Sequence, residues 1–370
     1  MTPEDAALYT EHDDDVDDRM GATVPADERP PTGALRDRLG LGLVIALAVA
    51  VVLALVATNL ARSASPATAI QTALGGQQLR IMAPANPGGG WDQTARAAQS
   101  SLADVVGRSE VYNVGGAGGT PGLAQFVQHR GDASQLMVTG AIMIGAVITN
   151  ESPYSLQDVT MLARLSTEYL VLVVPAESEV EDLDDLVGRM RDDVGGQSIS
   201  GGSAGGVEQI LAGLFAQAAG ADPAEVSYVA HSGGGEALTT LLSGRSVAGI
   251  SGISEIAPYI ADGSVRALAV SSPERVENLP EVPTFHEQGL DVELQNWRGI
   301  AAPEGVSAAD EEALVTMLTE MHDTEAWAEI VEARGWGDEF LTGPELDEFV
   351  AEQEETIGAV LDDIGLGGAA

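Results

Sequence analysis

The sequence contains neither cysteine nor lysine, and its 17 basic side chains are all arginine. Without cysteine the chain has no disulfide framework, no thiol nucleophile and no site for a lipid on an N-terminal cysteine. Without lysine it lacks the residue that a Walker-type phosphate loop and a pyridoxal Schiff base both require. These absences exclude several enzyme classes, and we expect neither a cofactor nor a bound metal.

Positive charge is also scarce, because 57 acidic residues stand against those arginines and give a formal net charge of −40. Affinity for phosphate backbones comes from lysine and arginine, so nucleic acid is excluded as a partner. We interpret the acidity as a solubilising surface; attraction of cationic ligands is the lesser alternative. A local anion site remains compatible with this field, since salt screens distant charges beyond roughly 8 Å.

The N-terminal part of the chain differs from the remainder. Residues 1–38 are acidic and rich in proline and threonine, which predicts disorder. Residues 39–61 carry no charge, and about 20 apolar residues suffice to span a bilayer as a helix. Arginines on the N-terminal side favour an orientation with the following chain outside the cytoplasm. We therefore predict a membrane anchor at 39–61 and a flexible linker at 62–77.

Cleavage of that apolar segment is the alternative to an anchor. Ala67, Thr68 and Ala69 have the small-x-small form of a signal-peptidase site. Cleavage near Ala69 would release a secreted protein. The long acidic lead favours an uncleaved helix that holds the protein at the membrane.

From residue 77 onward, short apolar runs alternate with segments of helical period, which predicts an α/β fold with mainly parallel sheets. The expected strands are 79–83, 110–114, 136–139, 161–165, 169–174, 198–200, 226–230, 247–250, 267–271 and 297–301. The expected helices include 94–106, 120–128, 180–192, 206–219, 234–243 and 308–321, with an amphipathic capping helix at 344–361.

Three glycine-rich turns follow expected strands, at 84–92, 115–120 and 231–236. Glycine lets backbone N–H groups converge, and a strand, a glycine turn and a helix N-terminus together form an anion-binding pocket. In the first turn we expect Gly88, Gly89 and Gly90 to contact a ligand. Trp91 is either a pocket wall or a core anchor, and Asp92 is a candidate N-cap for the next helix.

The second turn predicts ligand contacts from Gly118, Gly119 and the Thr120 hydroxyl, with a purely structural loop as the alternative. Its glycines do not give G-x-G-x-x-G in frame, so a dinucleotide site is not supported. In the third turn, the candidate ligand contacts are Ser232, Gly233 and Gly234. His231 beside them is expected to be structural or at the pocket edge.

The segment 201–205 matches G-x-S-x-G, the pattern of a nucleophile elbow. A serine hydrolase would need His231 or His286 near Ser203, together with an oxyanion loop, and no His-Gly-Gly motif precedes Ser203. The favoured interpretation is a cradle in which Ser203, Ala204 and Gly205 contact an anion.

Arg298 lies in an apolar strand context, where an arginine needs a partner. It either pairs with a buried acid or offers its guanidinium to a ligand carboxylate.

Taken in order, five segments resemble the extracytoplasmic solute receptors of tripartite tricarboxylate transporters. The similarity covers 79–305 and extends more weakly to the end of the chain. The segments that carry it are 79–92, 115–122, 201–206, 231–237 and 265–284.

The resemblance implies a two-lobed, α/β, periplasmic-binding-protein-like fold (type II-like) with strands that cross the hinge. One lobe would comprise 78–174 and 290–370, and the other 175–289. It also implies a receptor without catalytic activity that captures a small carboxylate, citrate-like or a dicarboxylate. The turns at 88–92 and 232–235 would hold the carboxylate through N–H groups and waters, and the Ser203 loop would line the cleft.

The partners implied are a small and a large membrane subunit of a transporter, with the receptor itself a monomer. Two alternatives stay open at this point: the serine hydrolase, and a sensory binding protein that signals to a partner rather than delivering a solute.

Overall fold

The computed structural model describes residues 47–51 and 66–367. The chain divides into two compact units, Met1–Ser63 and Ala64–Ala370. In the first unit, residues 47–51 are helical. The remainder of the expected anchor and the whole acidic tail lie outside the described residues. Among the helices that the structure does describe, none has the length and apolar character that a membrane crossing requires.

The second unit begins with a packed helix where a flexible linker was expected. Helix α2 (Pro66–Ala73) contacts α11 (Ala308–His322) and α4 (Ala103–Val106). Ile70 and Leu74 lie one helical turn apart, and both are buried. Burial of this apolar stripe makes the segment part of the folded unit, so the linker prediction is wrong for residues 66–74. The candidate cleavage site at Ala67–Ala69 falls inside the same helix.

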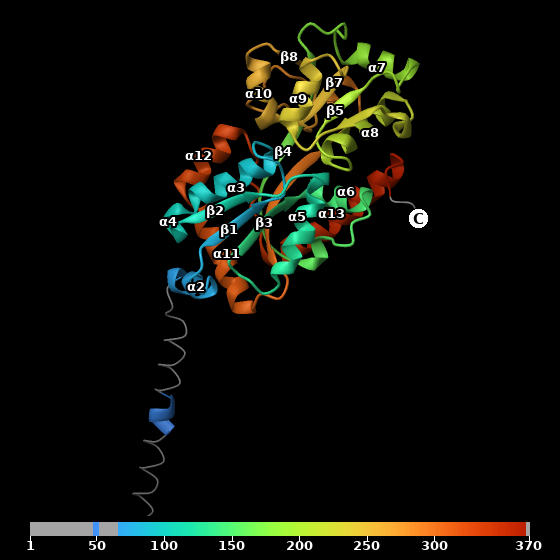
Figure 1. The fold of residues 1–370 in the computed structure, drawn as a ribbon. Helices are drawn as coiled ribbons and strands as arrows, with labels where there is room; N and C mark the ends of the chain where they lie inside the picture. Colours follow the sequence, from blue (N-terminus) through green and yellow to red (C-terminus); the bar gives the residue numbers. More distant parts are fainter. Residues whose placement is uncertain (1–46, 52–65, 368–370) are drawn as a thin grey trace, which may run out of the picture. The chain divides into compact units, whose positions relative to one another are not determined.

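The first of two sheets has the strand order β2-β1-β3-β9-β4, in which β4 comprises Val159–Pro175. Figure 1 labels β1, β2, β3 and β4. β1 (Leu79–Ala83) runs parallel to β2 (Ser109–Asn113) and to β3 (Gln135–Gly140). β9 (Gln295–Pro303) is antiparallel to β3. The helices of this lobe, besides α2, α4 and α11, are α3 (Gly90–Ser101), α5 (Thr120–Phe126), α6 (Ala141–Thr149), α12 (Glu325–Arg334) and α13 (Gly343–Asp363).

The second sheet belongs to a second lobe and contains β5 (Ile199–Gly201), β6 (Tyr228–Ala230), β7 (Ala248–Gly252) and β8 (Val265–Val270). β5 runs parallel to β6 and β7. The helices of this lobe are α7 (Leu183–Asp192), α8 (Val207–Ala219), α9 (Gly234–Leu242) and α10 (Ile253–Ala261).

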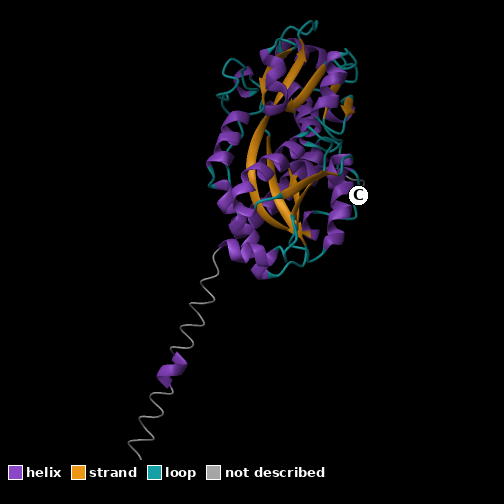
Figure 2. Cartoon of the chain, turned by 60° about the vertical axis from the view of Figure 1, so that its left-hand side comes forward, coloured by secondary structure: helices purple, strands orange, loops and turns teal. Residues whose placement is uncertain are grey.

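The two lobes share one long strand, β4 (Val159–Pro175). Its first part pairs antiparallel with β9 and its second part with β7 and β8. Figure 2 shows the strands of the fold in orange, with helices around them. The sequence predicts two separate strands here, because the polar triplet Ser166-Thr167-Glu168 interrupts the apolar pattern. All three side chains are buried, so the strand continues through them. The sheets are mixed, and the expectation of mainly parallel sheets is wrong at β4 and β9.

The two-lobed α/β fold itself is confirmed. The main hydrophobic core runs through the first lobe and into the second, and a smaller cluster lies between β4, β8, α9 and α10. The C-terminal amphipathic helix is present as α13, with Leu346, Val350, Ile357 and Leu361 buried. Helix α6 was not expected, because its residues are apolar on nearly every side and show no helical period.

Candidate functional site

A pocket lies between the lobes, at the N-terminal ends of several helices. It holds about 570 Å³ of empty space, which includes its open mouth. Residues from the first turns of α3, α6, α8, α9 and α10 line it. The first N–H groups of a helix have no partner inside that helix and carry a partial positive charge. Their convergence makes this pocket suited to an anion.

Most of the expected glycine-turn contacts lie at this pocket, together with Arg298, and the others do not. The expected residues that line it are Gly89, Gly90, Trp91, Gly118, Ser203, Ser232, Gly233, Gly234 and Arg298. The expected residues that lie outside its lining are Gly88, Asp92, Gly119, Thr120, Ala204 and Gly205. The structure thus brings residues from all the glycine-rich segments to one place.

The first turn owes its shape to Asp92, which is not the N-cap. The N-cap is Gly89, and Asp92 lies in the first turn of α3. One of its oxygens accepts a hydrogen bond from the Gly88 N–H at 2.8 Å, and the other accepts from Asn113 of β2 at 2.9 Å. Burial raises the pKa of Asp92, but hydrogen bonds from Arg96, Gly88 and Asn113 outweigh it, so the net pKa is lowered. Asp92 therefore fixes the turn as a carboxylate and does not reach the pocket.

Trp91 is both a pocket wall and a core anchor. Its side chain lines the pocket and is buried, and its Nε1–H has no hydrogen-bond partner within the protein. A Cβ on Gly119 would lie 2.6 Å from the Trp91 ring. Gly119 has a φ of 88° and packs beneath the indole rather than facing the pocket. Thr120 donates its hydroxyl to the Ala117 carbonyl instead of to a ligand.

The Ser203 loop contacts the opposite lobe. Ser203 lines the pocket, whereas Gly205 packs on α6, where a Cβ would overlap the Thr149 hydroxyl. The Gly205 N–H donates to the side chain of Gln209 at 2.8 Å. Gly205 therefore serves lobe contact, and Ser203 alone of the loop's three predicted residues faces the pocket.

The arrangement does not support the serine-hydrolase alternative. The Nδ1 of His231 lies 3.2 Å from the Gly201 carbonyl, and its Nε2 lies 2.8 Å from the Thr240 hydroxyl. The ring nitrogens of His286 lie near Asp291 and Glu293. Both imidazoles are thus engaged away from Ser203. His231 holds α9 to the end of β5 and is structural.

The third turn brings the lobes together. A Cβ on Gly233 would lie 3.9 Å from the Cα of Gly89, so the two glycine turns face each other across the pocket. Glu236 accepts a hydrogen bond from the Asn86 side chain at 3.2 Å and another from the Ser232 N–H at 3.2 Å. These contacts join residues of α9 and of the loop after β1. The structure therefore has its lobes in contact around the pocket.

Arg298 pairs with an acid and still presents free donors. Its Nη2 donates to Glu168, which also accepts from the Ser254 N–H at 2.6 Å. Both side chains are buried on the crossing strands. The Nε and Nη1 of Arg298 have no partner within the protein, and Arg298 lines the pocket. The pairing alternative is confirmed, and the free donors remain available to a ligand.

Three polar residues of the pocket were missed from the sequence: Glu208, Glu255 and Asn296. Glu208 and Glu255 lie in the first turns of α8 and α10, where acids are common as stabilisers of the helix end. Because an acid is ordinary at this position, nothing in the sequence marked these two as pocket residues. Asn296 was detectable, because it is two residues from Arg298 on the same strand and must share its face.

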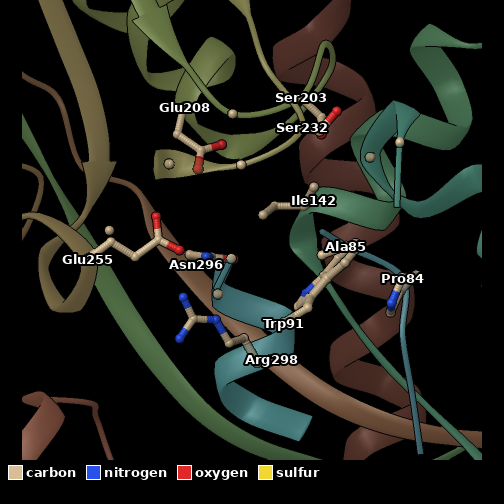
Figure 3. Close-up of a pocket in the computed structure, with 18 residues that line it drawn as sticks. Pro84, Ala85, Trp91, Ile142, Ser203, Glu208, Ser232, Glu255, Asn296 and Arg298 are labelled. Atoms are coloured by element: carbon tan, nitrogen blue, oxygen red, sulfur yellow. The ribbon is translucent and has the colours of Figure 1, made fainter. Parts of the chain in front are cut away.

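Glu208 and Glu255 line the pocket (Figure 3). Glu208 is buried and Glu255 is half-buried, and both bind protons more tightly than usual. Burial raises the pKa of Glu208 from 4.5 to about 7. Burial, together with the nearby Glu168 carboxylate, also raises the pKa of Glu255, although Arg298 partly opposes this. Glu255 accepts from the Ser251 hydroxyl at 3.0 Å, whereas one oxygen of Glu208 has no partner within the protein.

The family model described as "Tripartite tricarboxylate transporter family receptor" matches residues 94–366. Protein BugT of Bordetella pertussis is 26% identical over 293 residues, which cover 78% of this chain and 89% of BugT.

Two solved structures share the fold. MatC from Rhodopseudomonas palustris, with bound malate, has a TM-score of 0.69 at 22% identity and covers 77% of this chain and 98% of its own. An R. palustris protein with adipate has a TM-score of 0.72 at 20% identity and covers 79% of this chain and 98% of its own.

Proposed function

Because the chain belongs to the family of tripartite tricarboxylate transporter receptors, we propose that it captures a small carboxylate outside the cytoplasm and delivers it to the transporter's membrane subunits. Closure of the two lobes around the ligand would present the loaded form to those subunits. The ligands printed for two neighbours of the same fold, malate and adipate, support a carboxylate for this chain as well. No chemical step is assigned to the site.

The observation that carries the proposal is the convergence of glycine turns and unused donors on one buried pocket. The turn at Gly89 and Gly90 faces the turn at Ser232–Gly234 from the other lobe. Arg298 adds donors that the protein itself does not use. A charge-assisted hydrogen bond contributes roughly 1.5–3 kcal/mol. A few such bonds suffice for micromolar affinity, which corresponds to about −8 kcal/mol.

The proposal also includes the boundaries of the two lobes and a membrane anchor at the N-terminal end. We assign 78–174 and 290–370 to one lobe, on which α2 packs, and 175–289 to the other. We further propose that 39–61 remains as a membrane anchor, because cleavage near Ala69 would cut through α2 and remove part of a packed helix. A monomeric receptor with an uncleaved helix needs no lipid attachment to stay near its transporter.

The test is calorimetric titration of the full chain, purified in a mild detergent, with citrate, succinate, malate and a neutral sugar. We expect micromolar binding of at least one carboxylate and none of the sugar. Gly234→Asp should abolish binding, since a side chain at Gly234 would overlap Glu255 inside the pocket. Gly235→Asp is the matched control, because nothing lies within 4 Å of a Cβ at that exposed neighbouring position.

Loss of binding in Gly234→Asp with retention in Gly235→Asp would support the pocket as the carboxylate site. Equal affinity in both variants would place the carboxylate elsewhere. Tighter binding of the neutral sugar than of every acid would remove carboxylates as the working ligand.

A further inference from the structure

The pocket holds more negative charge than its cation can balance. Glu208 and Glu255 line it, and Glu168 lies directly behind it. Arg298 is the positively charged side chain in the lining, and it is bound to Glu168. The charge of Arg298 is thus matched before Glu208 and Glu255 are counted. An anion that enters this site meets two further carboxyl groups.

The partial positive charges at the helix N-termini do not balance the excess negative charge of the pocket. Glu208 and Glu255 each lie in the first turn of a helix, where the helix dipole favours a carboxylate. Even so, burial raises the pKa of both groups above the ordinary value. Removal from water therefore outweighs the helix ends and Arg298 together. A counter-charge supplied from outside the protein would stabilise both carboxylates.

A second observation points to a donor on the ligand. Asn296 lines the pocket and is 3% exposed, and its Oδ1 has no hydrogen-bond partner within the protein. The Oε2 of Glu208 is also buried without a partner. Figure 3 shows the carboxylates of Glu208 and Glu255 pointing towards the same space, with Asn296 beside it. An unfilled buried acceptor is costly, and an ionised dicarboxylate without a hydroxyl group, such as succinate or glutarate, has no N–H or O–H to fill it.

The same pocket offers unfilled donors. Arg298 has a free Nε–H and Nη1, and the Nε1–H of Trp91 is free as well. These donors suit a carboxylate, whereas the acceptors do not. The pocket thus combines a surface for an anion with a surface for a cation, within one small volume.

We propose that the ligand carries a positively charged nitrogen in addition to its carboxylate, and that Glu208, Glu255 and Asn296 receive this nitrogen. The carboxylate accepts from the free donors of the pocket, and the ammonium N–H groups fill the acceptors, which lie beside the glycine turns. This inference rests on the proposed receptor function and names the chemical class of its substrate. A plain di- or tricarboxylate would leave Glu208 and Glu255 unbalanced.

The test compares carboxylates with partners of the same skeleton that bear an amino group: glutarate with glutamate, succinate with aspartate, and propionate with β-alanine. Each is titrated calorimetrically into the full chain in detergent at pH 8, with chelator present. We expect at least one amino member to bind about 30-fold more tightly than its carbon-only partner, the scale of one charged hydrogen bond.

Two substitutions in the pocket and one outside it sharpen the result. Glu208→Gln and Glu255→Gln should each reduce the preference for the amino member at least about tenfold, because each removes one full charge. The same variants should bind the carbon-only acid more tightly than the wild type does. Glu225→Gln, an exposed acid in the same lobe, should leave both affinities unchanged. If the pocket variants do not fold, the proposal is decided by the wild-type protein's preference for the amino member and by the pH dependence of that preference.

The pH dependence separates this proposal from proton uptake by Glu208. The charged or titratable groups around Glu208 are Glu255, Glu168, Arg298 and Tyr228. Between pH 8 and pH 6 the ionised fraction of Glu208 falls, so affinity for an amino carboxylate should fall too. A protonated Glu208 that donates to a plain carboxylate would give the opposite trend.

Three outcomes would overturn the proposal. Carbon-only acids could bind as tightly as their amino partners, which would leave the receptor function standing and remove the cationic subsite. A carbon-only acid could bind tightly only when Mg²⁺ replaces the chelator, which would give the cation role to a metal. If no acid of either kind bound to the folded protein, the proposed function would fail together with the subsite.

Discussion

Glu208 should make the folded protein less stable at neutral pH than a variant without this charge. Its pKa is about 7 in the folded state, against an ordinary value of 4.5. A carboxyl group with a raised pKa stabilises the fold fully below its unfolded pKa, and this contribution is lost as the pH rises through the folded pKa. The loss therefore spans about pH 4.5 to 7.

The size of the effect follows from the pKa difference, since each unit corresponds to about 1.36 kcal/mol. The shift of Glu208 amounts to roughly 3 kcal/mol, an upper figure because relaxation around the carboxylate reduces it. Glu208→Gln removes the charge and keeps the shape of the side chain. We expect the variant to gain stability relative to the wild type as the pH rises, by up to about 3 kcal/mol at pH 8.

The assay is urea unfolding of residues 64–370, the compact unit, followed by circular dichroism at several pH values between 5 and 9. The decisive quantity is the difference in unfolding free energy between the variant and the wild type, and how this difference changes with pH. Any fixed cost of the new amide cancels from that change. Glu225→Gln should show no such pH dependence. A difference that stays constant from pH 5 to 8 would refute the argument that burial of Glu208 governs its ionisation.

Three further outcomes are expected. Arg298→Met should destabilise the fold by about 3–5 kcal/mol, and adding Glu168→Leu should restore much of this in urea unfolding, because the second change removes the orphaned acid; additive losses would contradict a coupled pair. Asp92→Asn should cost about 1–3 kcal/mol near pH 7. Because the folded pKa of Asp92 is lowered, this cost should shrink as the pH falls below about 4, and a loss independent of pH would contradict its role as a carboxylate. Trp91→Phe should remove the ligand-induced change in intrinsic fluorescence, since Trp91 is the one of the four tryptophans that lines the pocket; an undiminished signal would place the ligand elsewhere.

The features that the sequence predicted correctly depend on local signals. Glycine-rich turns after short apolar strands are visible as runs of residues, and three of them place glycines at the pocket. The C-terminal helix shows its buried face through its spacing. The linker prediction failed because α2 is short and its burial depends on α11, which lies far away in the sequence.

The features that could not be predicted depend on long-range contacts. Residues Ser166–Glu168 look like a break between strands, because their burial against the distant C-terminal segment and Arg298 is not visible locally. Likewise, an acid in the first turn of a helix ordinarily stabilises that helix in solvent. Only the packing of both lobes shows that Glu208 and Glu255 are enclosed.

The position of Asn296 and Arg298 on β9, beside β4, has a consequence for the order of events during binding. β4 passes from one lobe to the other and pairs with β9, so these residues lie close to the axis about which the proposed closure turns. Points close to the axis move least, whereas the glycine turns at Gly89 and Gly233 move with their separate lobes. A solute can therefore settle first on the stationary strands and be enclosed afterwards. Its arrival and its retention become separate kinetic steps, the first limited by diffusion and the second by rotation of the lobes.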